Sequence, residues 1–427
     1  MWECFFRKSS KIQGDIMTTN KPSPSATNKK FDPAKFFVAC VTVSAVIYFV
    51  IYLIIGNGRF SDVFFKRCAD FFMDFFNSVR DASQGSGVYT ERGVIYPPMA
   101  NLIFLIMSRF TPNAYNDTSF ADRYEWSNYF PAMMLVVMLC TAIAMVYFFI
   151  VYTRLDTPSR NTRFAFAFLS FFSVPVLYTV ERGNMILFCV LALMIYGFTY
   201  NSDSKLHREL GLIALAFAFS IKLYPVVFGW FLIADKRIKD ALRCALYGIL
   251  MLLLPSFFFG GPVCFVYVFD NIFNFSTGTG STLTSIFNYL ALSEGAQSAV
   301  TVLTYAWVLV CGLCFAISPF IKEQRYKTWV LGLVTILCVP SLTSLYGWAF
   351  FVIPLVIICN KKERTARDIA YTVLMTIPFM FLPFRIMYYV ATSTAAVYVM
   401  TAALSIWAVT DTAINATHYI KTKRLSS

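Results

Sequence analysis

Carboxylates recur at helical spacing in one polar and aromatic stretch of the sequence. Over residues 62–81, a helical repeat of 100° per residue puts Asp70 and Asp74 on a polar face and phenylalanines on the opposite face. A helix of this kind is expected to lie flat on a membrane with its phenylalanine face buried. One of the two carboxylates would then be placed to act as a general base toward a lipid-bound substrate, although a solvated polar face is the alternative interpretation.

Two cations lie in sequence contexts that suit an anionic ligand. Lys222 has apolar sequence on both sides. An ionisable side chain at membrane depth is a functional hypothesis, with the phosphate of a lipid carrier as its partner, unless the side chain snorkels to the interface. Arg182, in Glu181-Arg-Gly-Asn, offers a planar fork for a phosphate, or it caps a tight turn. Tyr96, followed by two prolines, forms either a turn or a surface on which a sugar stacks.

The elements that must position these residues are apolar. Of the 427 residues, 58% are hydrophobic and 14% are charged, whereas a soluble domain usually has about 25% charged residues. An apolar run of about 20 residues spans a ~30 Å hydrocarbon core as a helix, and these runs do not alternate as barrel strands would. The sequence therefore predicts an all-α, polytopic transmembrane helical bundle. About ten spans are expected, at residues 37–56, 131–152, 164–180, 184–200, 241–260, 297–319, 329–345, 347–360, 369–388 and 391–414.

Lysine and arginine cluster in short segments between these runs. Positive segments face the cytoplasm. This predicts a plasma-membrane protein with both termini on the cytoplasmic side and long outer loops at residues 57–130 and 261–296. Residues 210–234 have basic flanks on both sides, which predicts a re-entrant hairpin that breaks near residues 222–225, because proline disfavours helix just before it. The expected parts are a disordered basic tail at 1–36, a membrane domain at 37–414 and a cytoplasmic basic tail at 415–427.

The charge and cysteine patterns argue against other classes of protein. The net charge of +13 comes from those short segments, so no nucleic-acid partner is expected. The 11 cysteines fall mostly in apolar runs, where they are typical core residues. The two histidines lie in basic segments and the outer loops contain no Asp-x-Asp motif, so we assign no metal and no cofactor.

Several short motifs occur along the chain in one order. They are Asp74-Phe-Phe, Tyr89, Tyr96-Pro-Pro, Arg182-Gly-Asn, Lys222-Leu-Tyr-Pro and Pro340-Ser-Leu-Thr-Ser-Leu-Tyr346. In this order and spacing the chain resembles glycosyltransferase family 87 between residues 37 and 400. Members of that family include polyprenol-phosphate-mannose-dependent α-1,2-mannosyltransferases.

The resemblance implies a GT-C fold, a polyprenyl-phosphate sugar donor and a catalytic aspartate in the first outer loop. The interval to Tyr89 assigns that role to Asp74, with Asp70 as the second choice. The resemblance implies donor or phosphate binding by Arg182, Asn184, Lys222 and Tyr224, and substrate lining by Tyr89, Tyr96, Tyr346 and Trp348. Some relatives have a histidine near the Pro340 motif, where this chain has Tyr346, so Tyr346 takes that role or the role is vacant.

These features together predict a membrane glycosyltransferase. It would move a hexose, with mannose favoured, from a polyprenyl-phosphate donor to an envelope glycolipid or polysaccharide acceptor at the outer face of the membrane. Its partners would be the lipid donor, the glycan or glycolipid acceptor and the bilayer. A transporter or lipid flippase is the alternative, but it predicts repeated halves with matching broken helices, and the sequence has one broken segment and no detectable repeat. A non-catalytic subunit in envelope polymer assembly is a third interpretation.

Overall fold

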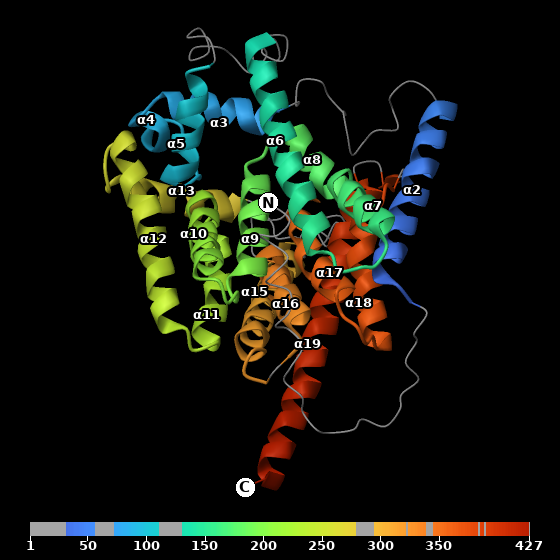
Figure 1. Ribbon diagram of the computed structural model, residues 1–427. Coiled ribbons are helices and arrows are strands. Elements are labelled where there is room, and N and C mark those ends of the chain that lie inside the picture. The colour runs from blue at the N-terminus through green and yellow to red at the C-terminus, as the bar shows by residue number, and fades with distance from the viewer. Residues whose placement is uncertain are drawn as a thin grey trace.

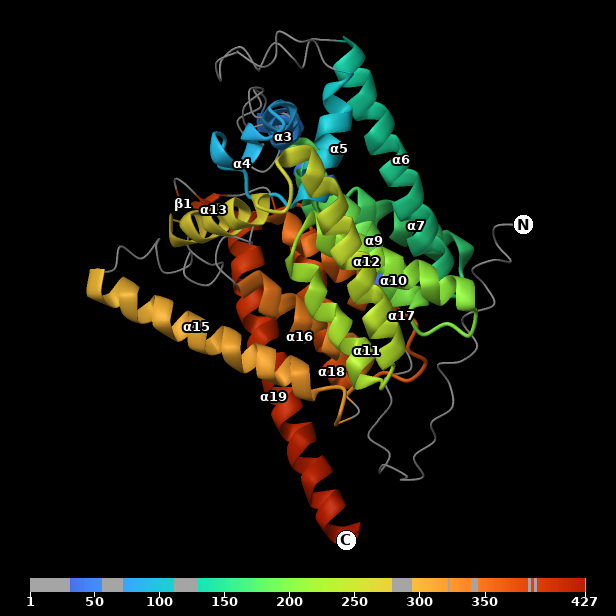
Figure 2. The ribbon, with the colours of Figure 1, turned by 90° about the vertical axis from the view of Figure 1, so that its left-hand side faces the viewer.

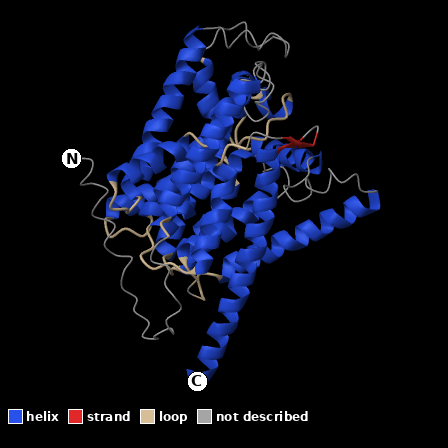
Figure 3. Cartoon of the chain, turned by 90° about the vertical axis from the view of Figure 1, so that its right-hand side faces the viewer, coloured by secondary structure: helices blue, strands red, loops and turns tan. Residues whose placement is uncertain are grey.

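The computed structural model describes most of the chain as helices. It describes residues 31–55, 72–110, 130–278, 294–321, 323–338, 345–382, 385–387 and 390–426. Helices make up almost all of the regular structure in these residues, which confirms the all-α prediction (Figure 1). The exception is an antiparallel pair of short strands, β1 (Arg385–Met387) and β2 (Val390–Ala391), which lies at one side of the molecule in Figure 3.

Five described helices are long and apolar enough to cross a membrane. They are α2 (Pro33–Ile55), α6 (Phe130–Arg154), α12 (Ile238–Ser256) with the short η6 (Phe257–Phe259), α15 (Glu294–Ile317) and α19 (Thr392–Ser426). A sixth candidate is the pair α7 (Arg160–Phe171) and α8 (Val174–Arg182), which is bent by 43° at the break between the two helices. These helices support a membrane protein with fewer spans than the sequence suggested.

The other apolar helices are short and lie inside the protein. α9 (Ile186–Thr199) has 14 residues and α17 (Val352–Cys359) has 8, and most residues of both are buried. A 14-residue helix is ~21 Å long, which is less than the ~30 Å hydrocarbon core. The prediction of about ten spans is therefore not supported by the described helices, because hydropathy alone does not separate a lipid-facing span from a short core helix.

The predicted hairpin breaks where the sequence suggested. α10 (Lys205–Ile221) ends at Lys222, whose backbone is extended at φ −138° and ψ 128°, and the chain returns through η5 (Tyr224–Gly229) and α11 (Trp230–Ala234). Pro225 in the first turn of η5 disfavours helix just before it. Arg237, after α11, donates a hydrogen bond to the carbonyl of Tyr200, before α10. Both ends of the hairpin therefore lie at the same end of the molecule.

The two long segments predicted as outer loops meet at the other end. The first segment contributes α3 (Met73–Ser83), α4 (Gly87–Thr90) and α5 (Pro98–Ser108), and the second contributes α13 (Cys264–Gly278) (Figures 1 and 2). Tyr89 packs with Phe259 and Cys264 in a small cluster separate from the main core. The amide of Asn271 also donates to the carbonyl of Tyr89 at 2.9 Å. These contacts fix the two segments to each other.

The amphipathic helix expected at 62–81 is described only from Met73, where α3 begins, and residues 62–71, including Asp70, lie outside the described residues. Its phenylalanine face packs against protein. Phe76 is 1% exposed, and Phe75 meets Phe104 of α5 edge to face with 6.1 Å between ring centroids. The prediction that this face is buried in lipid is therefore wrong for the described part of the helix. Packing on protein fixes the rotation of α3 and so the direction of the Asp74 side chain.

The chain ends differ in part from the sequence-based expectation. Residues 1–30 of the expected N-terminal tail lie outside the described residues. The helix expected at 369–388 is shorter, because α18 (Ala366–Thr376) passes into η8 (Ile377–Phe379) at Pro378, which has no N–H to donate. The expected C-terminal tail continues α19 as helix through Ser426, and this helix runs past the others in Figures 1 and 2.

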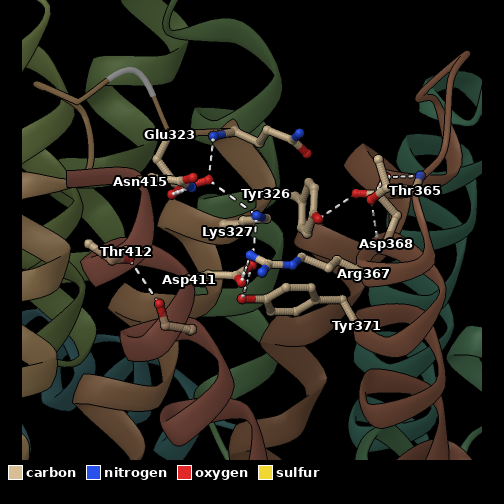
Figure 4. A network of polar contacts seen from close by, with 12 residues as sticks. Glu323, Tyr326, Lys327, Thr365, Arg367, Asp368, Tyr371, Asp411, Thr412 and Asn415 are labelled. Atoms are coloured by element: carbon tan, nitrogen blue, oxygen red, sulfur yellow. Dashed lines mark hydrogen bonds and ion pairs between the residues drawn. The ribbon is translucent and has the colours of Figure 1, made fainter. Parts of the chain in front are cut away.

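A buried ionic network joins α16 (Arg325–Cys338), α18 and α19 near the base of the hairpin (Figure 4). Lys327 Nζ lies 2.7 Å from Asp411 Oδ2 and 3.4 Å from Glu323 Oε1, and Arg367 pairs with the other oxygen of Asp411. The side chains of Lys327 and Asp411 are only 7% and 4% exposed. A buried charge that loses its partner is strongly destabilising, so these pairs constrain how the three helices dock.

Candidate active site

Asp74 lies in the first turn of α3, and two side chains from the turn between α8 and α9 hold its carboxylate. Arg182 Nη2 lies 2.6 Å from Asp74 Oδ1, and Asn184 Nδ2 lies 2.8 Å from Asp74 Oδ2. The side chains of Asp74 and Arg182 are 21% and 28% exposed, so the pair is open to a ligand on one side. An ionised carboxylate has about four lone-pair sites, so Asp74 can accept a further hydrogen bond from a substrate hydroxyl.

A glycine makes the close approach of this turn to α3 possible. Gly183 ends α8 with a φ of +66°, and a Cβ at this position would lie 2.7 Å from Phe75 Cβ. The N–H of Phe72 donates to the carbonyl of Glu181 at 2.7 Å, which ties the start of α3 to the same turn. The residues on either side of Gly183 can reach Asp74 only because this turn sits directly on α3.

Replacing Gly183 with alanine is therefore expected to damage the site. The methyl group would clash with Phe75. Alanine in the left-handed region also costs about 1–2 kcal/mol, so the Tm should fall by a few degrees. Displacement of the turn from α3 should lower the catalytic rate of the site by about tenfold or more. The Tm is measured as a melting curve and the catalytic rate as an initial rate, both on the purified variant.

Gly85→Ala is the matched control for this substitution. Gly85 has a φ of +58°, but no heavy atom lies within 4 Å of the position of its Cβ. The control should lose stability through backbone strain alone and keep its catalytic rate per folded molecule. A loss of rate as large as that in Gly183→Ala would mean that the close approach to α3 does not position the site.

Lys222 reaches the same region from the tip of the hairpin. Its Nζ lies 4.1 Å from the centroid of the Tyr96 ring. The Tyr96 hydroxyl lies 3.5 Å from Asn184 Nδ2, the nitrogen that also contacts Asp74. Among the residues that the structure describes, no carboxylate forms an ion pair with Lys222. A chain of contacts through Tyr96 and Asn184 therefore links the ammonium to the Asp74 carboxylate.

Tyr89 and Asn101 fix the backbone of Tyr96. The Tyr89 hydroxyl donates to the Tyr96 carbonyl at 3.1 Å, and Asn101 Nδ2 lies 2.8 Å from the Tyr89 hydroxyl and 3.2 Å from the same carbonyl. Tyr89 is 2% exposed and Asn101 is fully buried. Burial and, to a lesser extent, the Asp74 carboxylate raise the pKa of the Tyr96 phenol, so this hydroxyl keeps its proton at neutral pH.

Two further predicted residues border the same region. Tyr346, in η7 (Leu345–Phe351), stacks on Tyr178 of α8 with 6.1 Å between ring centroids, one helical turn before Arg182. Tyr224 meets Phe350 of η7 edge to face, with 6.1 Å between ring centroids. The stacked rings of Tyr178 and Tyr346 therefore lie one helical turn from Arg182, next to the charged groups.

Tyr89 and Trp348, which were expected to line the substrate, pack against protein. Trp348 is fully buried, and its indole N–H donates to the Thr401 hydroxyl of α19 at 3.3 Å. Tyr89 lies beneath Tyr96 and holds its carbonyl. We therefore keep only Tyr96 and Tyr346 as candidates to line the substrate site.

Two residues that the sequence did not single out help to build the site. Gly183 lies inside the Arg-Gly-Asn motif, but only its contact with α3 explains why a glycine is needed there. Asn101 is a polar residue in a short apolar run, and buried polar side chains usually have hydrogen-bond partners. That signal could have indicated a structural role for Asn101, but not its contact with Tyr96.

The described side chains could accept a proton and hold an anionic ligand at the same place. Within the described ranges, no group of three or more His, Cys, Asp or Glu residues could hold a metal ion. The site combines one carboxylate, one guanidinium and one ammonium around Tyr96 and Asn184. A carboxylate can take a proton from an attacking hydroxyl, and fixed cations can stabilise charge on a leaving phosphate.

Comparison with known proteins agrees with this chemistry. A family model described as glycosyltransferase family 87 matches residues 95–344, more than half of the chain. The match contains Tyr96, Arg182, Asn184 and Lys222 and begins after Asp74. No curated protein and no solved structure matches the chain. The chain has helices that are long and apolar enough to span a membrane, and it belongs to glycosyltransferase family 87, a family of glycosyltransferases.

Proposed function

We propose that this chain transfers a hexose, with mannose favoured, from a polyprenyl-phosphate donor to a glycolipid or polysaccharide acceptor of the cell envelope. The proposed fold type is GT-C. The observation that carries the proposal is the cluster of Asp74, Arg182, Asn184 and Lys222. Such a cluster joins a carboxylate base to two cations, and cations of this kind bind phosphate oxygens well.

Asp74 acts as the general base in the proposed reaction. It accepts the proton of an acceptor hydroxyl while the hydroxyl oxygen attacks the anomeric carbon of the donor sugar. The new glycosidic bond forms as the bond between the anomeric carbon and the phosphate oxygen breaks. The lipid phosphate leaves with the electron pair. Attack on the face opposite the leaving group inverts the configuration at the anomeric carbon.

Arg182 and Lys222 are assigned to the leaving phosphate. Negative charge grows on its oxygen in the transition state, and cations that are already in place stabilise that charge. A guanidinium has five N–H donors, so Arg182 can bind a phosphate while Nη2 keeps its contact with Asp74. Asn184 holds the second oxygen of Asp74, which keeps the base oriented during this exchange.

The proposed site faces the outside of the plasma membrane. Arg237 and Arg325 lie together at the base of the hairpin, where both contact residues next to its ends. Basic segments favour the cytoplasmic side, so the opposite end, with α3, α4 and α5, is assigned to the outer face. Both termini are then cytoplasmic, and a lipid donor can enter from the outer leaflet.

An assay with labelled polyprenyl-phosphate sugars tests the proposal. The purified protein is incubated with donors that carry mannose or another hexose, and with envelope glycolipids as acceptors. We expect label to pass from polyprenyl-phosphate mannose to an acceptor. Movement of the donor across a vesicle membrane without bond formation would support the flippase alternative, which the family match does not favour. If neither activity were detected, the result would support a non-catalytic subunit.

Replacing Lys222 with methionine is expected to weaken donor binding while leaving stability unchanged. Methionine keeps most of the volume and removes the charge. A hydrogen bond to a charged group contributes about 1.5–3 kcal/mol, so the Kd of the donor should rise roughly 10- to 100-fold. The measurement is the Tm with and without polyprenyl phosphate. The lipid should raise the Tm much less in the variant than in the wild type.

Lys239→Met is the matched control, because Lys239 is exposed in the first turn of α12 at the base of the hairpin. It should respond to polyprenyl phosphate as the wild type does. If the lipid stabilised Lys222→Met as strongly as the wild type, Lys222 would not contact the phosphate.

A further inference from the structure

We infer that Tyr96 is a positioning residue that couples the donor-binding cation to the general base, rather than a platform on which the sugar stacks. The inference rests on the proposed function. It assigns one task to the ring, which orders the ammonium of Lys222, and another to the hydroxyl, which orders the amide of Asn184. Tyr96 would then act on the reaction through these two neighbours.

The ring of Tyr96 restrains the ammonium of Lys222. Nζ lies 4.1 Å from the ring centroid, which is within the range of a cation–π contact. A lysine side chain has four flexible carbons, so an ammonium without such a contact would sample many positions. The ring covers one side of the ammonium, and the N–H groups on its other sides can still bind a phosphate oxygen.

The hydroxyl of Tyr96 faces the side chain that holds the base. It lies 3.5 Å from Asn184 Nδ2, and the same nitrogen lies 2.8 Å from Asp74 Oδ2. An amide nitrogen carries two N–H groups, so one can point to the carboxylate and the other to the phenol oxygen. The N–H of Ile186 donates to Asn184 Oδ1 at 3.0 Å. A phenol on the other side of the amide adds to this restraint and so helps to keep the contact with Asp74.

The backbone of Tyr96 is held firmly enough for this role. Its carbonyl accepts hydrogen bonds from the hydroxyl of Tyr89 and the amide of Asn101, both of which are buried. Pro97 follows directly in the chain and has a fixed φ of −60°. The ring also meets Phe104 edge to face, with 5.8 Å between centroids. One face of the ring is therefore occupied by Lys222 and one edge by Phe104, so the ring is fixed where it can hold the ammonium.

Two substitutions at this one position separate the two tasks. Tyr96→Leu removes both the π face and the hydroxyl, so we expect the KM for the donor to rise roughly 3- to 30-fold, the range of cation–π contacts, and kcat to fall as it does in Tyr96→Phe. Tyr96→Phe keeps the ring and removes the hydroxyl, so the donor KM should stay within about twofold while kcat falls by about 3- to 10-fold. Phe110→Leu is the control, because this exposed ring lies just after the end of α5, and it should leave both constants near those of the wild type.

A double-mutant cycle with Lys222→Met gives the decisive readout. If the ring acts through the ammonium, Tyr96→Leu should weaken donor binding in the wild type but have little further effect in Lys222→Met. The cycle is read from the stabilisation of each variant by polyprenyl phosphate and so does not require transfer. Additive effects would overturn the inference. Polyprenyl phosphate carries no sugar, so a Tyr96→Leu variant that it stabilises as strongly as the wild type, with a raised KM for the sugar donor, would overturn the inference and favour sugar stacking. A coupled cycle in a protein that transfers no sugar would overturn the proposed function and leave the coupling in place.

Discussion

Replacing Asp74 with asparagine is expected to lower the rate of transfer by about 10²–10⁴-fold, the usual loss for a positioned general base. Asparagine keeps the shape of the side chain, and α3 should stay docked because Phe75 and Phe76 pack against protein. The substitution also releases Arg182 from its ion pair, so binding of the donor phosphate should be unchanged or tighter. The measurements are initial rates at saturating donor and the Tm with polyprenyl phosphate.

Asp81→Asn is the matched control on the same helix. Asp81 pairs with the neighbouring Arg80 at 2.5 Å, within α3, whereas Asp74 pairs with the turn between α8 and α9. The control should transfer sugar at nearly the wild-type rate. Wild-type turnover by Asp74→Asn would remove Asp74 from the mechanism and leave Asp70 as the remaining candidate for the base.

Replacing Asp411 with asparagine should have the largest effect on stability, a loss of about 3 kcal/mol in the free energy of unfolding. Lys327 and Arg367 both point to this carboxylate (Figure 4). Once it is removed, Glu323 Oε1, 3.4 Å from Lys327 Nζ, is the remaining acidic partner of that ammonium in the described chain. Removal of one partner from a buried pair leaves an uncompensated charge in a medium of low dielectric. The measurement is denaturant unfolding in detergent, together with transfer per folded molecule, which should not change.

Asp235→Asn is the control for this second substitution. Asp235 pairs with Arg325 at 3.1 Å near the same end of the molecule, but the two side chains are 28% and 26% exposed. An exposed pair contributes about 0–1 kcal/mol, so the control should lose little stability. If Asp411→Asn were no less stable than Asp235→Asn, the network would contribute no more than a surface pair to the docking of α19.

The membrane character of the chain and the break in its hairpin follow from local sequence. Apolar runs are buried in protein or face lipid wherever they lie. Pro225 interrupts a helix whatever packs around it. The number of spans does not follow in this way. Residues 186–199 and 352–359 are as apolar as true spans, and they lie in the core because helices from elsewhere in the chain cover them.

The two cations could be noticed in the sequence, Lys222 because apolar residues flank it and Arg182 because it lies in a short polar turn, whereas the choice of Asp74 over Asp70 came from the resemblance to a family. Tyr89 and Trp348 show the limit of that reasoning. Both aromatic side chains fit a sugar site by residue type, yet both are buried in the protein. Residue type indicates what a side chain can bind, whereas burial is set by the packing of neighbouring helices.

By itself, the sequence determined that the protein is helical, apolar and interrupted at Lys222, because these properties depend on residues adjacent in the chain. Only the tertiary structure decided which groups meet. Asp74 contacts Arg182 and Asn184 because α3 packs on a turn more than 100 residues away, at a distance that a single Cβ on Gly183 would prevent. Lys222 meets the ring of Tyr96 for the same reason. Such contacts depend on the fit of surfaces between distant helices, which no local pattern of residues encodes.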